Sequence, residues 1–307
     1  MSAKPHWWID TDPGVDDAWA ILMMRAAEVD VVGVSVVGGN VGLEHTARNA
    51  LRLVDLFAAP PPVFAGCAKP MIGGLPDAAF VHGADGFGDA LLPPPAATLQ
   101  QAHGAQALID ASFREPLNLL ALGPLTNIAL ALMLDPTLPS RCARFVVMGG
   151  AVNGQGNTAI PSAEFNIGFD PEAAAMVFSR WPGIELVDWS LTLRAAPGVR
   201  DVLDWLSASA PLARWMRAIT HKTEAFVRER EAGQWAWADP LAAFVALHPD
   251  CARYEHFRVR VECGLGAARG QTIVDRVGIS GWQDPMVAIV ADIDTSLFHE
   301  HMRQALL

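Results

Sequence analysis

Four carboxylates stand within eight residues near the N-terminus, where the chain is expected to pass from a strand into a helix. They are Asp10, Asp12, Asp16 and Asp17. Carboxylates this close repel one another and raise each other's pKa, so a fold that gathers them needs a compensating cation. Hard cations prefer oxygen ligands of this kind. The cluster therefore predicts a metal site at the end of a buried strand.

The residues around the cluster favour this geometry. Residues 6–9 are apolar and aromatic, which is typical of a short buried strand. Side chains alternate along a strand, so Asp10 and Asp12 are expected on one side and Thr11 on the other. Pro13-Gly14 then turns the chain into an apolar run with the composition of a helix.

Helix capping is the simpler explanation of part of the cluster. Asp16 can cap the helix and Asp17 can complement its dipole, each effect stabilising the helix by about 1 kcal/mol. Capping does not account for the two carboxylates that end the preceding strand. We therefore favour the metal site.

The composition sets limits on the class of protein. The chain has 307 residues, 51% of them hydrophobic, and a net charge of -11. This acidity argues against nonspecific binding to nucleic acid or to anionic membranes. The most apolar stretch, 117–134, is broken by Gly123-Pro124, and neither a membrane span nor a signal peptide is expected. The four cysteines form no CxxC pair, which favours reduced thiols in the cytoplasm.

Strand and helix patterns alternate along the chain. This alternation predicts an α/β fold of one domain, residues 1–307, with a doubly wound, mostly parallel sheet and helices on both faces. The expected strands are 6–9, 29–37, 62–65, 117–122, 145–148, 184–187, 256–262, 271–274 and 286–293. The expected helices are 16–28, 43–58, 103–115, 126–134, 170–180, 202–231, 239–247 and 296–306.

Polar residues follow several of these strands, at the sheet edge where such folds bind ligands. Asn40, Thr126-Asn127, Glu164 and Asn166 all fall there. Singly, Asn40 is typical of a turn, Thr126 of a helix cap and Glu164 of a solvated loop. Together with the Asp cluster they indicate recognition of a polyol, because adjacent hydroxyls can bind a hard cation and donate to carboxylates.

The run from Asp10 to Ala18 resembles the DxDPGxDDA signature of the inosine-uridine preferring nucleoside hydrolases. Other blocks of that family follow in the same order between about residues 6 and 247. They are Gly39-Asn40-Val41, His82-Gly83 with Gly86-Phe87-Gly88, Gly123-Pro124-Leu125-Thr126-Asn127, Met148-Gly149-Gly150, Ala163-Glu164-Phe165-Asn166 with Asp170-Pro171-Glu172-Ala173, and Asp239-Pro240-Leu241-Ala242. The resemblance implies a Rossmann-like fold and hydrolysis of the N-glycosidic bond of ribonucleosides to ribose and free base.

The resemblance also implies a calcium ion and its ligands. These would be Asp12, Asp17, Asp239 and the backbone carbonyl of Thr126, together with two ribose hydroxyls and the attacking water. Asp12 would take a proton from that water, whose pKa the ion lowers. Asp10 would lie behind these residues and support them. The residues implied to contact the nucleoside are Asp16, Asn40, Glu164 and Asn166 at the ribose, Asn157 at its 5′-hydroxyl, and His82 near the base.

Two positions depart from the family pattern. Many members carry His, and others Trp, directly before the late metal-ligand Asp, where this chain has Ala238. The Asn that the family often has six residues before the Glu is Thr158 here, so Asn157 matches only after a one-residue insertion. Other side chains are available to assist the departing base: His82, His221, Arg228, Trp235 and Trp237.

The base preference stays open between purine, pyrimidine and both. Four aromatic residues can either stack on a base or pack in the core: Trp215, Phe226, Trp235 and Trp237.

Three rival functions remain. A haloacid-dehalogenase-type phosphatase also begins with a strand and DxD, but Gly14 stands where it needs Thr or Val. Ala238 prompts the second, a nucleoside- or ribose-binding protein that has lost turnover, and the third is a hydrolase of a modified riboside. By analogy with the family, a homo-oligomer, either dimer or tetramer, is expected.

Overall fold

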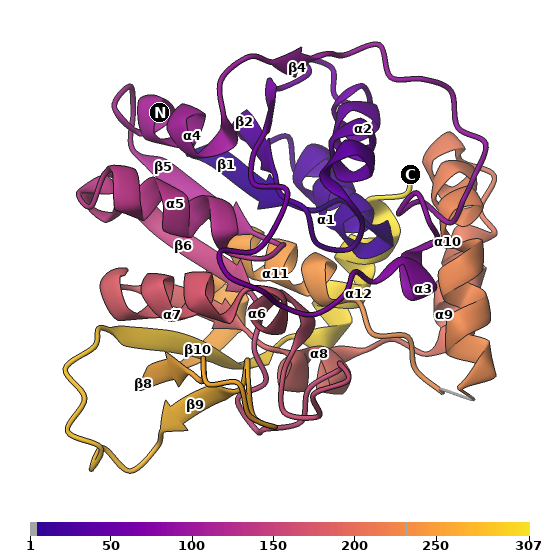
Figure 1. Cartoon of the computed structure of the whole chain (residues 1–307). Coiled ribbons are helices and arrows are strands. Elements are labelled where there is room, and N and C mark those ends of the chain that lie inside the picture. Colours follow the sequence, from indigo (N-terminus) through magenta and orange to yellow (C-terminus); the bar gives the residue numbers. More distant parts are fainter. Residues whose placement is uncertain (1–4, 231–232) are drawn as a thin grey trace.

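The computed structural model describes residues 5–230 and 233–307, and a ten-stranded sheet runs through this part of the chain (Figure 1). The strand order is β4-β3-β2-β1-β5-β6-β7-β10-β8-β9. The strands are β1 His6–Thr11, β2 Asp30–Val36, β3 Val63–Ala65, β4 Leu99–Gln100, β5 Leu117–Ala121, β6 Cys142–Met148, β7 Ile184–Val187, β8 Ala252–Val261, β9 Thr272–Asp275 and β10 Met286–Ile293.

The sheet is mostly parallel, as expected from the alternating pattern. β1 lies between β2 and β5 and pairs with both in parallel, with Ile9 opposite Val34 on one side and Leu120 on the other. Only β8 and β9, at one edge, run antiparallel to their neighbours. The carboxyl ends of the parallel strands therefore meet along one edge of the sheet.

Helices cover both faces. They are α1 Val15–Ala26, α2 Leu43–Val54, α3 Ala79–His82, α4 Gly104–Ser112, α5 Thr126–Leu134, α6 Phe165–Phe169, α7 Pro171–Arg180, α8 Trp189–Ala195, α9 Val199–Leu206, α10 Pro211–Glu229, α11 Ala238–Leu247 and α12 Thr295–Gln304. One core cluster takes side chains from α1, α2 and α8 to α12, and a second from α4, α5 and α7. The doubly wound fold class is thus confirmed.

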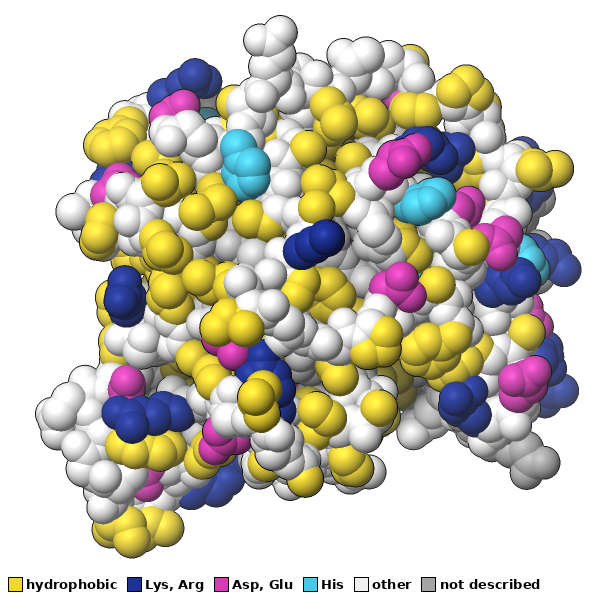
Figure 2. Space-filling view, viewed as in Figure 1, with side chains coloured by type: hydrophobic (Ala, Val, Ile, Leu, Met, Phe, Trp, Pro, Cys, Tyr) yellow, Lys and Arg dark blue, Asp and Glu magenta, His cyan; other side chains and the backbone are white. Residues whose placement is uncertain are grey.

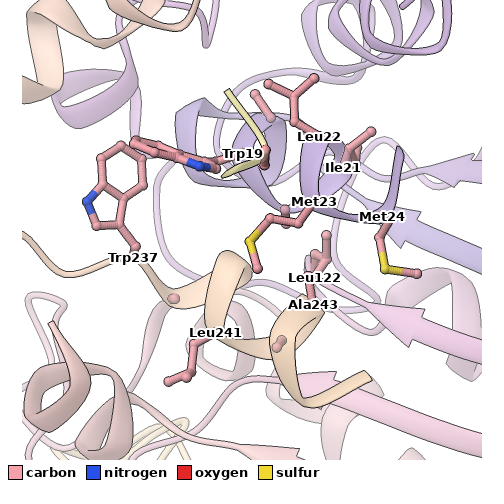
Figure 3. Close-up of a cluster of buried hydrophobic side chains, with 14 of the residues drawn as sticks. Trp19, Ile21, Leu22, Met23, Met24, Leu122, Trp237, Leu241 and Ala243 are labelled. Atoms are coloured by element: carbon pink, nitrogen blue, oxygen red, sulfur yellow. The ribbon is translucent and has the colours of Figure 1, made fainter. Parts of the chain in front are cut away.

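The neighbouring residues Trp7 and Trp8 show how one strand supplies both cores. Trp7 belongs to the first cluster and Trp8 to the second, and each is at most 2% exposed. In the first cluster, α1 packs on α11, with Trp19 contacting Trp237 at a ring-centroid distance of 4.5 Å (Figure 3). This packing places the N-termini of two helices beside each other.

Several element boundaries differ from the expected ones. The expected helix 202–231 is two helices, α9 and α10, separated by a break at 207–210. Pro211 begins α10, because its ring fits the first helical turn but not a helix interior. The expected helix 43–58 ends at Val54, and position 231 lies outside the described residues. The short elements α3, α6, α8 and β4 were not expected.

Charged side chains on the face shown in Figure 2 are mixed in sign, with basic and acidic groups interspersed along the side formed by α10. None of the helices in the described part of the chain is both long and apolar enough to cross a membrane.

Candidate active site

A cavity of about 340 Å³ opens at the carboxyl ends of the parallel strands. Its walls include residues from the segments that follow β1, β2, β5 and β7, within five residues of each strand's end. One group of lining residues is polar, and we call it the polar end: Asp16, Asn40, Asn157, Glu164, Asn166 and Asp239. A second group is largely aromatic and apolar, and we call it the apolar end: Phe80, Val81, His82, Trp189, Phe226, Val227, Trp235 and Trp237, with Thr223 and Arg230.

Three carboxylates meet at the polar end. Asp16, Asp17 and Asp239 each offer an oxygen, and these atoms lie within 4.8 Å of one another. Asp17 and Asp239 are buried, and Asp16 lies at the cavity wall. Burial raises the pKa of Asp239 well above its ordinary value, and the charges of Asp16, Asp17 and Asp12 raise it further. Such a group of anions is stable only when protonated or paired with a cation.

Asp12 belongs to the same electrostatic cluster. Burial raises its pKa well above the ordinary value, with a further contribution from the charge of Asp17. Its Oδ1 atom and the Oδ1 atom of Asp16 are buried and have no hydrogen-bond partner within the described residues. Unpartnered buried carboxylate oxygens are a ready ligand set for a hard cation, so the residues present fit a metal ion.

Helix geometry explains how the cluster forms. Asp17 lies in the first turn of α1 and Asp239 in the first turn of α11, and the two helices pack together. Helix N-termini carry partial positive charge that favours carboxylates. Asp17 also accepts hydrogen bonds from the backbone N–H of Gly14, at 2.9 Å, and from the hydroxyl of Thr11. Capping is therefore performed by Asp17 and not by Asp16, and Thr11 contacts the cluster from the opposite side of the strand.

Two glycines allow the backbone to approach Asp12 closely. A Cβ atom on Gly39 would lie 2.1 Å from Asp12 Oδ2, and one on Gly123 would lie 2.4 Å from Oδ1. Both distances are far below van der Waals contact, so any larger residue would displace the carboxylate.

Asn40 connects the end of β2 to the carboxylates. Its backbone N–H donates to Asp12 Oδ2 at 2.7 Å, and its Nδ2 donates to Asp17 Oδ2 at 3.1 Å. The side chain is 8% exposed and lines the cavity. Its backbone N–H and its side-chain amide thus each hold one carboxylate of the cluster, which a simple turn residue would not do.

Asp10 lies behind the cluster and does not line the cavity. Its Oδ1 accepts hydrogen bonds from the Ser35 hydroxyl and from Asn127 Nδ2. Burial raises its pKa to about 7. Asn127 also accepts from the backbone N–H of Cys67, so Asp10 is tied to β2 and α5.

Glu164 is buried and lines the cavity, so it is not a solvated loop charge. It caps α6, accepting from the backbone N–H groups of Asn166 at 2.9 Å and Ile167 at 3.1 Å, and also from Gly150 at 2.8 Å. Burial raises its pKa to about 7 despite these hydrogen bonds. Asn166 Nδ2 donates to the carbonyl of Leu122 at 2.6 Å, at the end of β5.

Thr126 does not cap α5, because the capping position is Leu125 and Thr126 is the first helical residue. Its hydroxyl donates to Asp170 Oδ2 at 2.7 Å, and its side chain does not line the cavity.

Asn157 does line the cavity, and its Oδ1 accepts from the N–H of Phe165 at 2.9 Å. The neighbouring Thr158 instead donates within its own loop, to Ile160 and Ala163.

His82 also lines the cavity. Its Nδ1 accepts from the backbone N–H of Val15 at 3.2 Å, so the proton of the neutral ring is on Nε2. Burial lowers its pKa to about 4. Ala238 also lines the cavity, so the position before Asp239 offers no titratable group.

The aromatic candidates divide between the core and the cavity. Trp215 packs edge-on against Phe87 and does not line the cavity, whereas Phe226, Trp235 and Trp237 do. His221 and Arg228 lie elsewhere: the first contacts its own helix backbone, and the second pairs with Glu224.

The sequence did not predict several residues of the apolar end, among them Phe80, Trp189, Thr223 and Arg230. Trp189 lies two residues after the end of β7, with Asp188 between them. Its place just after a strand was a signal in the sequence that it lies at the ligand-binding edge of the sheet. The other three lie on α3, α10 and the residue that ends α10, and they reach the cavity only through helix packing.

A cavity lined by carboxylates and by aromatic rings, at the carboxyl edge of a parallel sheet, is typical of a binding site for a small ligand with polar and apolar parts. The family model described as inosine-uridine preferring nucleoside hydrolase matches residues 7–300. The chain belongs to this family and is a hydrolase of the nucleoside hydrolase type. The phosphatase hypothesis is thereby excluded.

Relatives of several specificities resemble the chain. A probable uridine nucleosidase 2 from Oryza sativa subsp. japonica is 38% identical over 285 residues, which cover 89% of this chain and 82% of the relative. A non-specific ribonucleoside hydrolase from Salmonella agona is 37% identical over 96% of this chain and 95% of its own. The solved structure of an inosine-guanosine nucleoside hydrolase superimposes with a TM-score of 0.91 at 29% identity, covering 99% of both chains.

Proposed function

We propose that this chain hydrolyses the N-glycosidic bond of ribonucleosides, giving ribose and the free base, in a reaction that depends on Ca²⁺. The observation that carries the proposal is a single cavity lined both by carboxylates and amides and by aromatic rings. A ribose with its hydroxyls suits the polar end, and a planar base suits the apolar end.

The calcium ion would be held by Asp12, Asp17, Asp239 and the backbone carbonyl of Thr126. The unpartnered, buried Oδ1 of Asp12 supports this assignment, as does the grouping of Asp17 and Asp239 oxygens. When bound, a hard cation of this kind would hold adjacent ribose hydroxyls and lower the pKa of water.

The remaining polar residues would bind the ribose. Asp16 and Glu164 offer acceptor oxygens to hydroxyls, Asn40 and Asn166 offer amides, and Asn157 would reach the 5′-hydroxyl. Asp10 would support Asp12 from behind, through the bonds that tie it to Ser35 and Asn127.

Asp12 would act as the general base. It takes a proton from a water molecule, whose oxygen then attacks the anomeric carbon as the bond to the base nitrogen breaks. The electron pair of that bond leaves with the base, which takes up a proton from solvent water, while Asp12 returns its proton to solvent. The surrounding carboxylates stabilise the positive charge that develops on the ribosyl group.

The departing base would meet the aromatic end of the cavity. The Nε2–H of His82 is available there as a hydrogen-bond donor, because Nδ1 accepts from Val15. Phe226, Trp235 and Trp237 offer ring faces or edges for packing against the base.

Ala238 favours one second candidate, a nucleoside-binding protein without turnover, because the residue that assists base departure in many family members is absent. Hydrolysis of a modified riboside is the other form of the proposal, since the ribose end matches the family better than the base end does.

We further propose that the protein is cytoplasmic and that it assembles as a dimer or tetramer, with small nucleosides rather than nucleic acid or membranes as partners. The cytoplasmic proposal is supported by four free cysteines, which suit a reducing compartment.

The test is base release from a panel of purine and pyrimidine ribonucleosides, with chelator and with added Ca²⁺. Asp12→Ala should abolish release, whereas Asp110→Ala, which removes an exposed carboxylate on α4, should not. Because relatives act on uridine, on inosine and guanosine, or non-specifically, the panel must include all these bases. Calcium binding without turnover of any nucleoside would favour the binding role or a modified substrate.

A further inference from the structure

One buried carboxylate links the first residue of α5 to the start of α7 and to the loop at Met71. Asp170 is fully buried, and its Oδ2 accepts the hydroxyl of Thr126 at 2.7 Å and the backbone N–H of Met71 at 2.9 Å. Its Oδ1 accepts the N–H of Ala173 at 3.1 Å and so caps α7. The two oxygens therefore have separate tasks.

The place of Asp170 in the chain adds to this arrangement. It ends α6, whose first turn carries Asn166 and whose cap is Glu164, and it begins α7. Asn166 and Glu164 line the polar end of the cavity. The side chain of Asp170 thus connects the segment that carries Glu164 and Asn166 with Thr126, whose carbonyl is proposed to bind the metal ion.

We propose that Asp170 is a positioning residue for the metal site, acting through the hydroxyl of Thr126. The inference rests on the proposed function, in which the Thr126 carbonyl is a calcium ligand. A backbone carbonyl has no side-chain torsion of its own, so its direction is set by whatever fixes the turn. The hydrogen bond from the Thr126 hydroxyl to the buried Asp170 carboxyl group, at 2.7 Å, fixes the first residue of α5.

Capping of α7 is the competing explanation for Asp170, and the separate tasks of its oxygens allow a test. Thr126→Val removes the hydroxyl that reaches Oδ2 and keeps the shape of the side chain, while the bond from Ala173 to Oδ1 is left intact. A purely capping role of Asp170 therefore predicts no effect of Thr126→Val on metal affinity.

Calcium affinity of the metal-free full chain is measured by calorimetry for wild type, Thr126→Val and Thr126→Ser, beside a thermal melt of each. Thr126→Val should weaken calcium binding roughly 10- to 100-fold, the range typical for residues that orient metal ligands. Thr126→Ser keeps the hydroxyl and should bind close to wild type. Thr220→Val removes a similarly buried hydroxyl from α10, which donates to Arg217, and should leave the affinity unchanged.

Asp170→Asn, which removes the charge at constant shape, should weaken binding in the same direction and provides a second variant if Thr126→Val does not fold. Equal calcium affinity of wild type and folded Thr126→Val would overturn the positioning role while leaving the proposed function standing. Failure of the wild type itself to bind calcium would overturn the proposed cofactor, and the inference with it.

Discussion

The carboxylates of Asp17 and Asp239 meet because each lies in the first turn of a helix and the two helices, α1 and α11, pack side by side. The helix N-termini partly compensate two buried negative charges. They do not remove the need for a counter-ion, because burial still raises the pKa of both groups. The packing of the two helices thus brings two carboxylates together beside the cavity.

Replacing Gly39 by Ala should disable the site without unfolding the protein. The new Cβ would stand 2.1 Å from Asp12 Oδ2 and force that carboxylate to move. We expect at least a roughly tenfold loss of calcium affinity, by the same reasoning that applies to residues that orient ligands. Gly42→Ala is the matched control, because nothing lies within 4 Å of its added Cβ. Equal calcium affinity of the two variants would contradict this account of the close approach.

The stability of the metal-free protein should fall as the pH rises from 4.5 to about 7. Burial raises the pKa of Glu164 from 4.5 to about 7, so in this window the folded protein holds a proton that the unfolded chain releases. The stabilisation is therefore complete below pH 4.5 and is lost through pH 7. Glu164→Gln should flatten this part of the pH profile in thermal melts, and an unchanged slope would argue against a proton held on Glu164.

Phe226→Ala should weaken binding of the base without affecting ribose. The guanidinium carbon of Arg230 lies 3.6 Å from the ring centroid of Phe226. Phe226 also contacts Phe80, and all three residues line the apolar end of the cavity. Loss of one aromatic ring that stacks on the base should lower the binding free energy by about 1 kcal/mol or more, which corresponds to a KM raised by roughly fivefold or more. Inhibition by free ribose should stay as in wild type. A parallel loss of ribose affinity would mean that Phe226 shapes the whole cavity.

Calcium should raise the thermal stability of the wild-type protein in a concentration-dependent way, since a ligand that binds only the folded state stabilises it by mass action. Mg²⁺ should do so less, because it demands a smaller and stricter octahedral shell than a cluster of carboxylates and a carbonyl provides. Differential scanning calorimetry over a series of metal concentrations measures both effects, and equal shifts with the two ions would contradict the choice of calcium.

The sequence predicted the fold class because long strands buried on both faces and amphipathic helices leave clear patterns. It did not predict α3, α6 and α8, which have four to seven residues each and are too short to show a helical period. The break between α9 and α10 was also missed, although Pro211 marks it.

The polar end of the cavity was easier to predict than the apolar end. Asp16, Asn40 and Glu164 follow strands, and the ends of parallel strands necessarily meet. Phe80 and Arg230 reach the cavity only because α3 packs on α10, which no local pattern encodes. Likewise, local spacing could not reveal that Thr126 donates to Asp170, since that bond depends on how α5 and α7 lie together.

Base release by the metal-free protein, followed while calcium is added back stepwise, tests the central claim most directly. The account predicts that ribose and base appear only as calcium binds, with full activity at one ion per chain. Undiminished release from a nucleoside in the presence of excess chelator would contradict it.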